Sequence, residues 1–245
     1  MKFLEFFVRS KTDHISISPF SPIHILALIV LLALILFAAS FKNKSDKAKS
    51  KFKKILGWTM IITQTIIYIW FVWSKTFTIQ ESLPMYSCRV VILFFIYDIF
   101  VGNKYLKKVS IYWGLMGGIL AMAAPDMYPY SFPHITNFHF FIFHYCILIG
   151  AIFYIVADNE ILTKKDLIYV LKFTLVYNLG LLIFNLLVSI PFPIANYGFL
   201  INPPSILENM VPFRGILYMF IAQILYLIAI IVMHGVYLLI RKLTK

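Results

Sequence analysis

The stretch IHILALIVLLALILFAASF at Ile23–Phe41 decides the fold class, because His24 is its only ionisable side chain. A helix needs about 20 mostly apolar residues to cross the ~30 Å hydrocarbon core of a bilayer. Six more apolar stretches follow, and we interpret all seven as membrane spans: Ile23–Phe41, Ile55–Trp73, Leu83–Phe100, Val109–Ala124, Phe138–Val156, Leu167–Ile190 and Phe213–Ile240. The sequence therefore predicts an all-α, polytopic membrane protein.

The composition agrees with this fold class. Hydrophobic residues make up 61% of the chain and charged residues only 13%, and the mean hydropathy is +0.87. A soluble domain rarely has this balance, and the seven stretches leave no room for one, so residues 1–245 are expected to form a single seven-helix transmembrane domain. The amino-terminal segment does not have the pattern of a signal peptide, so we expect the first helix to be retained.

The basic residues predict an orientation. Seven lysines lie between Lys42 and Lys54 against the single acid Asp46, and further basic groups follow the third, fifth and seventh stretches. Cytoplasmic loops are the ones enriched in lysine and arginine. We therefore expect the amino terminus outside, the carboxyl terminus inside, and a multi-pass protein of the cell membrane. Orientation explains the net charge of +12, so we expect membrane lipids as partners and no nucleic acid.

Polar side chains inside the stretches are the best indication of function, because they are costly in lipid and usually face protein or water. Cys88 and Arg89 lie near the outer end of the third stretch, and His144 lies at a similar depth in the fifth. A cysteine and a histidine meeting across these helices is geometrically allowed. The other polar groups of this outer half are His24, Asp126, His139, Asn178, Asn185, Asn196 and Tyr197.

Each of these residues also has a structural interpretation. Arg89 can reach outward to lipid headgroups, and Cys88 or His144 can be an ordinary core residue. Asn178 and Asn185 can join neighbouring helices, and Asp126 can cap a helix or turn after Pro125. Cys146 is expected to be structural. The two cysteines do not suggest a disulfide framework, and no motif predicts a metal or another cofactor.

The order of several motifs resembles the bacterial YwaF-type integral membrane family, whose eukaryotic relatives include a transmembrane phospholipid acyltransferase. The matching segments are SPFSPIH at 18–24, LPMYSC at 83–88, WGLMGGILAMAAPD at 113–126, FFIFH at 140–144 and NYGFLINPP at 196–204. The resemblance implies that Cys88 and His144 are catalytic, and Asn196 and Tyr197 match its asparagine-tyrosine loop. The family pattern has a histidine where this chain has Tyr86.

Our leading hypothesis is acyl transfer on a phospholipid or lysophospholipid near the outer leaflet. Cys88 would be the nucleophile and His144 the general base and acid. Arg89 would bind a lipid phosphate or favour the thiolate, and Asn185, Asn196 or Tyr197 would stabilise the oxyanion. His139, Asp126 and His24 complete the predicted substrate-binding set.

Two other function classes stay open at this point. A transporter or sensor would have Arg89, Asp98 and the asparagines along a polar route to the cytoplasmic side. A membrane assembly factor would need no small-molecule ligand. A pocket open to lipid but closed at its inner half favours the enzyme, whereas a continuous polar route favours transport.

Overall fold

The computed structural model describes residues 3–204 and 207–244. Residues 1–2, 205–206 and 245 lie outside the described part. Seven long helices follow one another along the chain: α2 (Pro22–Ala39), α3 (Asp46–Trp73), α4 (Ser87–Phe100), α5 (Lys104–Ala123), α6 (Ile135–Val156), α7 (Lys164–Val188) and α8 (Gly215–Leu243). Three short elements complete the described part: α1 (Phe3–Phe7) and the 3₁₀ turns η1 (Ser40–Asn43) and η2 (Tyr197–Phe199).

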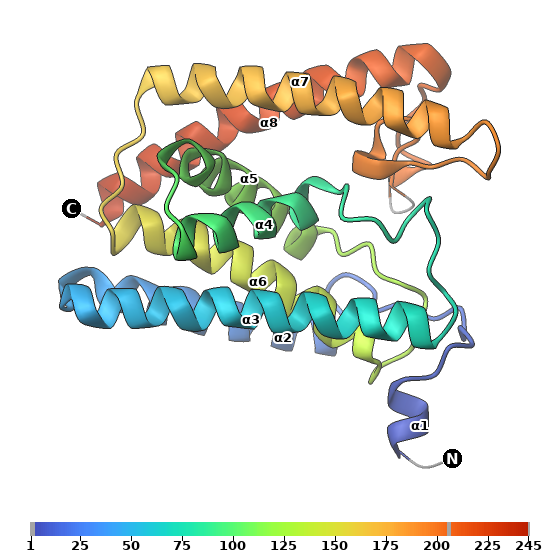
Figure 1. The fold of residues 1–245 in the computed structure, drawn as a ribbon, viewed down its shortest axis with the longest axis horizontal. Coiled ribbons are helices and arrows are strands. Elements are labelled where there is room, and N and C mark those ends of the chain that lie inside the picture. The colour runs from blue at the N-terminus through green and yellow to red at the C-terminus, as the bar shows by residue number, and fades with distance from the viewer. Residues whose placement is uncertain (1–2, 205–206, 245) are drawn as a thin grey trace.

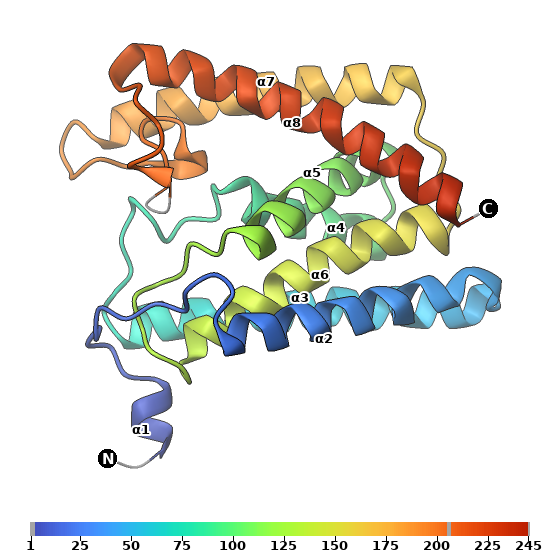
Figure 2. The same ribbon diagram turned by 180° about the vertical axis from the view of Figure 1, so that it is seen from behind.

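The long helices are arranged with α6 at the centre. Figures 1 and 2 show α2 and α3 on one side of the bundle, α7 and α8 on the other, and α4, α5 and α6 between them. α6 contacts α2, α3, α4, α5 and α8. In keeping with this position, 83% of its most apolar 18-residue segment is buried, against 22% to 33% in α2, α3, α7 and α8. The exposed apolar faces of those outer helices are suited to lipid.

Local sequence signals explain where the helices begin. Ser21, with Pro22 after it, caps α2 by accepting a hydrogen bond from the backbone of His24. Asn103 caps α5 by accepting from two backbone N–H groups, and Thr163 with Asp166 forms a capping box on α7. Such caps satisfy the first N–H groups of a helix, which have no partner within it.

Five helices of the described chain are long and apolar enough to cross a membrane: Pro22–Asn43, which joins α2 to η1, and α3, α6, α7 and α8. The predicted start of the third stretch at Leu83 is wrong, because α4 begins at Ser87. With 14 residues α4 is about 21 Å long, short of the ~30 Å hydrocarbon core. The fourth stretch also begins earlier than predicted, at Lys104, where Asn103 supplies the cap.

Glycines bring α5 and α6 together closely. A Cβ atom on Gly118 would lie 2.6 Å from the Cβ of Leu148, and one on Gly114 would lie 2.7 Å from the carbonyl oxygen of Ile147. Only hydrogen fits at such distances. The two glycines are four residues apart in the sequence, a small-xxx-small spacing that predicts a close helix contact, and this packing confirms it.

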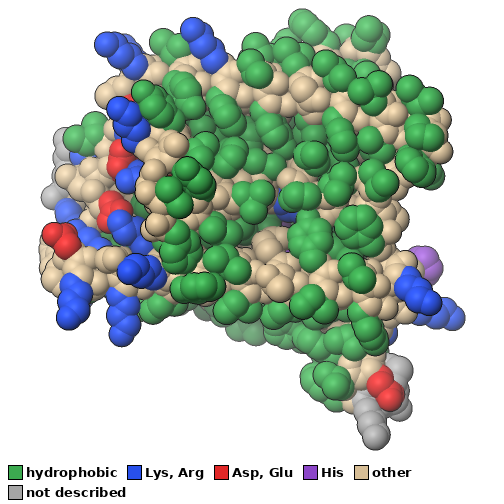
Figure 3. All heavy atoms as spheres, viewed as in Figure 1, with side chains coloured by type: hydrophobic (Ala, Val, Ile, Leu, Met, Phe, Trp, Pro, Cys, Tyr) green, Lys and Arg blue, Asp and Glu red, His purple; other side chains and the backbone are tan. Residues whose placement is uncertain are grey.

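Charged side chains gather at one end of the bundle. We call this the basic end; it comprises residues 40–54, 101–108, 157–165 and 241–244. Figure 3 shows its lysines and arginines at the left edge of an otherwise largely apolar face. The connections 74–86 and 124–134 and the described part of 189–214 lie at the opposite end, as Figure 1 shows. Arg9 joins the amino-terminal segment to that opposite end by donating hydrogen bonds to Asp13 and to the carbonyl of Ser131.

Candidate functional site

Cys88 lies in the first turn of α4, not in a second turn as the predicted start at Leu83 implied. Its thiol is half-buried and free. Gly117 of α5 lies beside it, since a Cβ on that glycine would be 3.6 Å from the Cβ of Cys88. The sulfur also interacts with the Arg89 charge and with the backbone N–H groups of residues 88 and 89. These groups favour a thiolate, but burial is the larger influence and favours the neutral thiol, so a base is needed to remove its proton.

Arg89 holds the connection between α3 and α4 in place. Its guanidinium donates to the carbonyl oxygens of Glu81, Ser82 and Leu83 at 2.8, 3.1 and 3.2 Å and to the Tyr128 hydroxyl at 3.3 Å. These bonds keep residues 81–83 out of the helix and set the start of α4. They also anchor the cation at the end of the bundle opposite the basic end, so a reach to lipid headgroups is not required to satisfy it.

His144 is buried in α6 between the rings of Phe140 and Phe143. Its Nδ1 atom lies 2.7 Å from the carbonyl oxygen of Phe140. A carbonyl oxygen can only accept, so in the neutral ring Nδ1 carries the proton and Nε2 keeps its lone pair. This tautomer is the one that a general base acting through Nε2 requires.

Arg89 connects the two predicted catalytic residues. Its charge interacts with the Cys88 thiol and with the His144 ring. Gly117 of α5 lies beside Cys88 and also beside Ile147, which follows His144 by about one turn on α6. No hydrogen bond in the described chain joins Cys88 to His144.

A groove of about 410 Å³ opens between α3 and α4 beside this junction. It is lined by Gln64, Thr65, Tyr68, Ile69, Pro84, Arg89 and Leu93. Figure 3 shows a basic group in a hollow of the apolar face, and Arg89 is the basic residue of the groove lining. His139 lies behind the groove, 3.4 Å from the Gln64 amide, and its ring also interacts with the Arg89 charge. The groove therefore combines apolar walls with one anchored cation.

Asn185, Asn196 and Tyr197 organise the long connection between α7 and α8. Asn185 donates to the carbonyl of Tyr197 at 2.9 Å and accepts from its N–H at 3.0 Å. Asn196 accepts from the N–H groups of Ile201 and Asn202 and donates to the carbonyl of Asn202. The Tyr197 hydroxyl donates to Ile79, burial raises its pKa to about 12, and its ring packs on Tyr86. All three residues bind backbone that covers the start of α4.

His24 and Asp126 lie near the carboxyl-terminal end of α5. The Nε2 atom of His24 lies 2.9 Å from the carbonyl of Met122, and its Nδ1 accepts from the N–H of Phe20. Both ring nitrogens are therefore used in joining α2 to α5. Asp126 is exposed in the connection after α5. Within the described residues, no three His, Cys, Asp or Glu side chains are grouped closely enough to hold a metal ion.

Several polar residues of the described chain were missing from the predicted site. The hydroxyl groups of Tyr86, Tyr177 and Tyr226 are near enough to Cys88 to influence it electrostatically. Asn178 and Gln223, both buried, have amide atoms without a hydrogen-bond partner in the described chain. An amide inside an apolar helix is a detectable signal, and Gln223 could have been found by it. The tyrosines gave no signal, because tyrosine is common where helices meet the membrane surface.

The comparisons with known proteins give one match. The model of the TMEM164 family matches residues 15–234, which contain every long helix except the last turns of α8. No match was found among curated proteins or among solved structures. The match covers most of the chain and agrees with several helices apolar enough to span a bilayer. The chain therefore belongs to the TMEM164 family of membrane proteins.

Proposed function

We propose that this chain is a membrane-embedded acyltransferase that uses Cys88 and His144 on phospholipid or lysophospholipid. One observation carries the proposal: Nδ1 of His144 lies 2.7 Å from the Phe140 carbonyl oxygen, which leaves Nε2 free to accept a proton. With Cys88 as nucleophile and the neighbouring Arg89 as cation, this base completes the residue types that covalent acyl transfer needs.

The reaction has two steps. His144 takes the thiol proton and the Cys88 sulfur attacks the ester carbonyl carbon, forming a thioester while the carbon–oxygen bond to the lipid breaks. The proton on His144 passes to the departing oxygen. In the second step His144 deprotonates the hydroxyl of an acceptor lipid, which attacks the thioester, and the sulfur leaves and recovers a proton.

The groove between α3 and α4 supports entry of a lipid from the side. Its exposed apolar residues Ile69 and Leu93 suit acyl chains, and Arg89 suits a phosphate, which accepts paired N–H donors from a guanidinium. His139 borders this groove through Gln64. Asn185, Asn196 and Tyr197 hold the connection between α7 and α8 over the start of α4. Tyr197 keeps its proton and can donate it in a hydrogen bond near Tyr86.

The inner half of α4 favours an enzyme over a transporter. Val91, Ile92 and Phe95 are fully buried and apolar, and they separate Arg89 from Asp98 along the helix. A solute route needs polar lining over its whole length, and α4 offers none across this segment.

The proposal includes how the seven long helices cross the membrane. All seven long helices cross the membrane of the cell as one domain, with the amino terminus outside and the basic end in the cytoplasm. Membrane lipids are the partners and nucleic acid is not. Within its family the chain belongs to the bacterial YwaF-type members.

The experiment is to incubate the purified chain with a phospholipid whose acyl group is labelled. We expect label on Cys88 that hydroxylamine releases, because hydroxylamine cleaves thioesters. Cys88→Ala should abolish the label, and His144→Gln should slow its formation by about 10² to 10⁴-fold.

Cys146→Ala is the matched control, because Cys146 is the other cysteine, buried in the same helix as His144. It should keep the label. Absence of label in the unmodified chain, or equal transfer by Cys88→Ala, would overturn covalent catalysis.

A further inference from the structure

The amino-terminal helix α1 projects from the bundle instead of packing into it. Figures 1 and 2 both show it beside the end of α3 that is opposite the basic end, displaced sideways from the long helices. None of its five residues is buried. With the long helices crossing the bilayer, as in the proposed topology, a sideways displacement runs along the membrane plane. α1 then lies at the membrane boundary, at the depth of the last turn of α3.

Specific contacts fix α1 at this depth. The indole of Trp70, in the last turn of α3, donates a hydrogen bond of 2.9 Å to the carbonyl of Val8, directly after α1. The ring of Phe7 packs on that of Phe138, in the first turn of α6, with centroids 5.6 Å apart. The position of α1 is therefore set by the ends of two long helices.

The exposed surface of α1 is apolar and aromatic. Phe3 and Leu4 are each 70% exposed, and Phe132 and Phe138 are each 41% exposed. Phe3 stacks on Phe7, and Phe138 contacts the rings of both Phe7 and Phe132. We call these four phenylalanines, together with Leu4, the amino-terminal patch. An exposed apolar patch of this kind marks a surface that meets a partner or a membrane.

The nearest ion pair does not prevent the amino-terminal patch from meeting lipid. Arg9 pairs with Asp13 at 2.7 Å, and its side chain is only 12% exposed. It also donates to the carbonyls of Phe6 and Ser131 at 2.6 and 2.9 Å. Glu5 is the acidic residue of α1 and is exposed. Interfacial helices keep such charged groups among the headgroups while their apolar side chains enter the boundary of the acyl chains.

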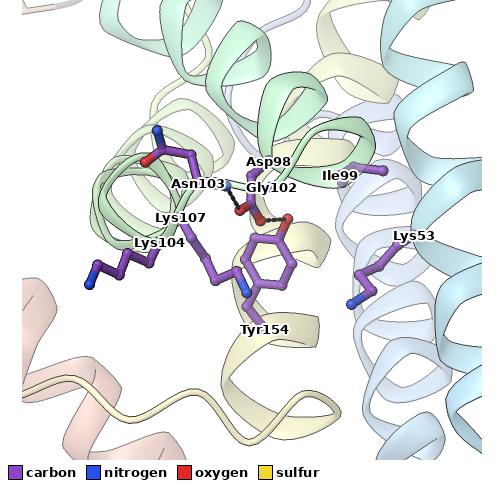
Figure 4. Close-up of a pocket in the computed structure, with 8 residues that line it drawn as sticks. All are labelled: Lys53, Asp98, Ile99, Gly102, Asn103, Lys104, Lys107 and Tyr154. Carbon is purple, nitrogen blue, oxygen red and sulfur yellow. Dashed lines mark hydrogen bonds between the residues drawn. The ribbon is translucent and has the colours of Figure 1, made fainter.

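The basic end is built differently. Its cavity of about 300 Å³ is lined by polar groups that bond to one another. Figure 4 shows Asp98 accepting hydrogen bonds from the Tyr154 hydroxyl and from the backbone of Asn103. Lys53, also in this lining, is paired with Asp158 at 2.6 Å. Charged and polar side chains therefore organise this end, whereas exposed aromatic side chains mark the amino-terminal segment at the other.

We propose that α1 and the amino-terminal patch form an interfacial anchor whose partner is the lipid surface of the membrane. The rings lie between the headgroups and the first part of the acyl chains, where aromatic and amphipathic segments are favoured. Position selects lipid as the occupant, because the patch extends sideways from the ends of α3 and α6. The anchor rests on these helices crossing the membrane, and it does not depend on acyl transfer.

The experiment measures the depth of a fluorescent label in nanodiscs of phosphatidylcholine, whose two faces are both open to water. In the full chain with Cys88→Ala and Cys146→Ala, a nitrobenzoxadiazole label is attached to Leu4→Cys. We expect strong quenching by a nitroxide on the upper acyl chain of the lipid and weak quenching by iodide in the water. Lys11→Cys is the control, because it is an exposed position of the same segment outside the patch. Its ratio of nitroxide to iodide quenching should be several-fold lower.

A label at Val72→Cys gives the reference depth, because Val72 is 70% exposed in the last turn of α3. Nitroxide quenching at Val72→Cys but not at Leu4→Cys would overturn the anchor alone. Lack of nitroxide quenching at both positions would overturn the membrane arrangement together with the anchor. Protection of the Leu4→Cys label from both quenchers would show that protein covers α1, and it would also overturn the anchor.

The double variant Phe3→Ser with Phe7→Ser separates the patch from the label itself. With the label again at Leu4→Cys, nitroxide quenching should fall several-fold, because two rings of the patch are lost. Unchanged quenching would mean that the label, and not the patch, seeks the lipid, and it would overturn the anchor. The unfolding midpoint of each labelled variant verifies that the bundle is folded.

Discussion

At the scale of single residues, His134 shows how the amino-terminal segment is joined to the bundle. Its ring is fully buried, stacks on Tyr130 with centroids 3.9 Å apart, and bonds to the Arg9 carbonyl at 2.9 Å and to Thr136 at 2.8 Å. Burial and the nearby Arg9 charge lower its pKa to about 4, although Asp13 and the Arg9 carbonyl act in the other direction. The neutral ring is therefore the folded form.

Because the folded chain holds His134 neutral, we predict that acid weakens the contact between the amino-terminal segment and the bundle. Between pH 6.5 and about 4 the unfolded chain binds a proton at His134 and the folded chain does not, so stability falls as the pH falls through that window, by at most about 3 kcal/mol. Burial raises the pKa of Asp13, but hydrogen bonds from Ser131 and Arg9 outweigh burial and hold the pKa below its usual value. Protonation of Asp13 therefore removes further stability at lower pH. The unfolding midpoint should drop between pH 7.5 and 5.

His134→Asn should flatten that pH dependence, because the titrating ring is gone. His14→Asn is the control, since His14 is an exposed histidine of the same segment with a backbone angle that asparagine tolerates. It should keep the slope of the unmodified chain. An unchanged slope in His134→Asn would refute the assignment.

At the scale of helices, the α5–α6 contact sets the position of the candidate site. Gly114→Ala would place a methyl group 2.7 Å from the Ile147 carbonyl oxygen. Because that oxygen belongs to the backbone of α6, relieving the overlap would require the two helices to move apart. We expect a loss of about 1 to 3 kcal/mol in the free energy of unfolding, as for other overpacked interiors. Urea or heat unfolding measures it.

Gly180→Ala is the matched control, since nothing lies within 4 Å of a Cβ at that helical position. It should leave stability unchanged or raise it by up to about 1 kcal/mol, because alanine is the better helix former. Equal effects of the two substitutions would mean that helix propensity, not packing, governs this contact.

Patterns along single helices predicted much of this fold. Apolar runs indicated all seven long helices, and the spacing of Gly114 and Gly118 indicated a close contact. The start of α4 could not be predicted, because it depends on Arg89 binding the carbonyls of residues 81–83 from the neighbouring turn. Likewise, the use of Asn185 by the Tyr197 backbone is a tertiary pairing that spacing does not contain.

At the scale of the whole molecule, the separation of two ends organises the possible chemistry. Ion pairs such as Lys53–Asp158 and Lys108–Glu160 join the connections of the basic end. The opposite end is held by hydrogen bonds among the amino-terminal segment, residues 128–134 and the connections after α3 and α7. Cys88, in the first turn of α4, lies toward this opposite end, away from the ion pairs of the basic end (Figure 1).

Because α4 is shorter than the hydrocarbon core, the number of membrane spans is tested by labelling single cysteines from each side of the membrane. Residues 101–108 lie at the basic end with residues 40–54 (Figure 1), so the turn at residues 101–104 and the connection before α3 should be reached from the same side of the membrane. In a background with Cys88→Ala and Cys146→Ala, we expect an impermeant maleimide to label Lys11→Cys in intact cells. Lys49→Cys and Lys104→Cys should react only after the membrane is opened. Labelling of Lys104→Cys in intact cells, with Lys49→Cys still protected, would contradict a crossing by α4 and α5 and leave α2, α3, α6, α7 and α8 as the candidate spans.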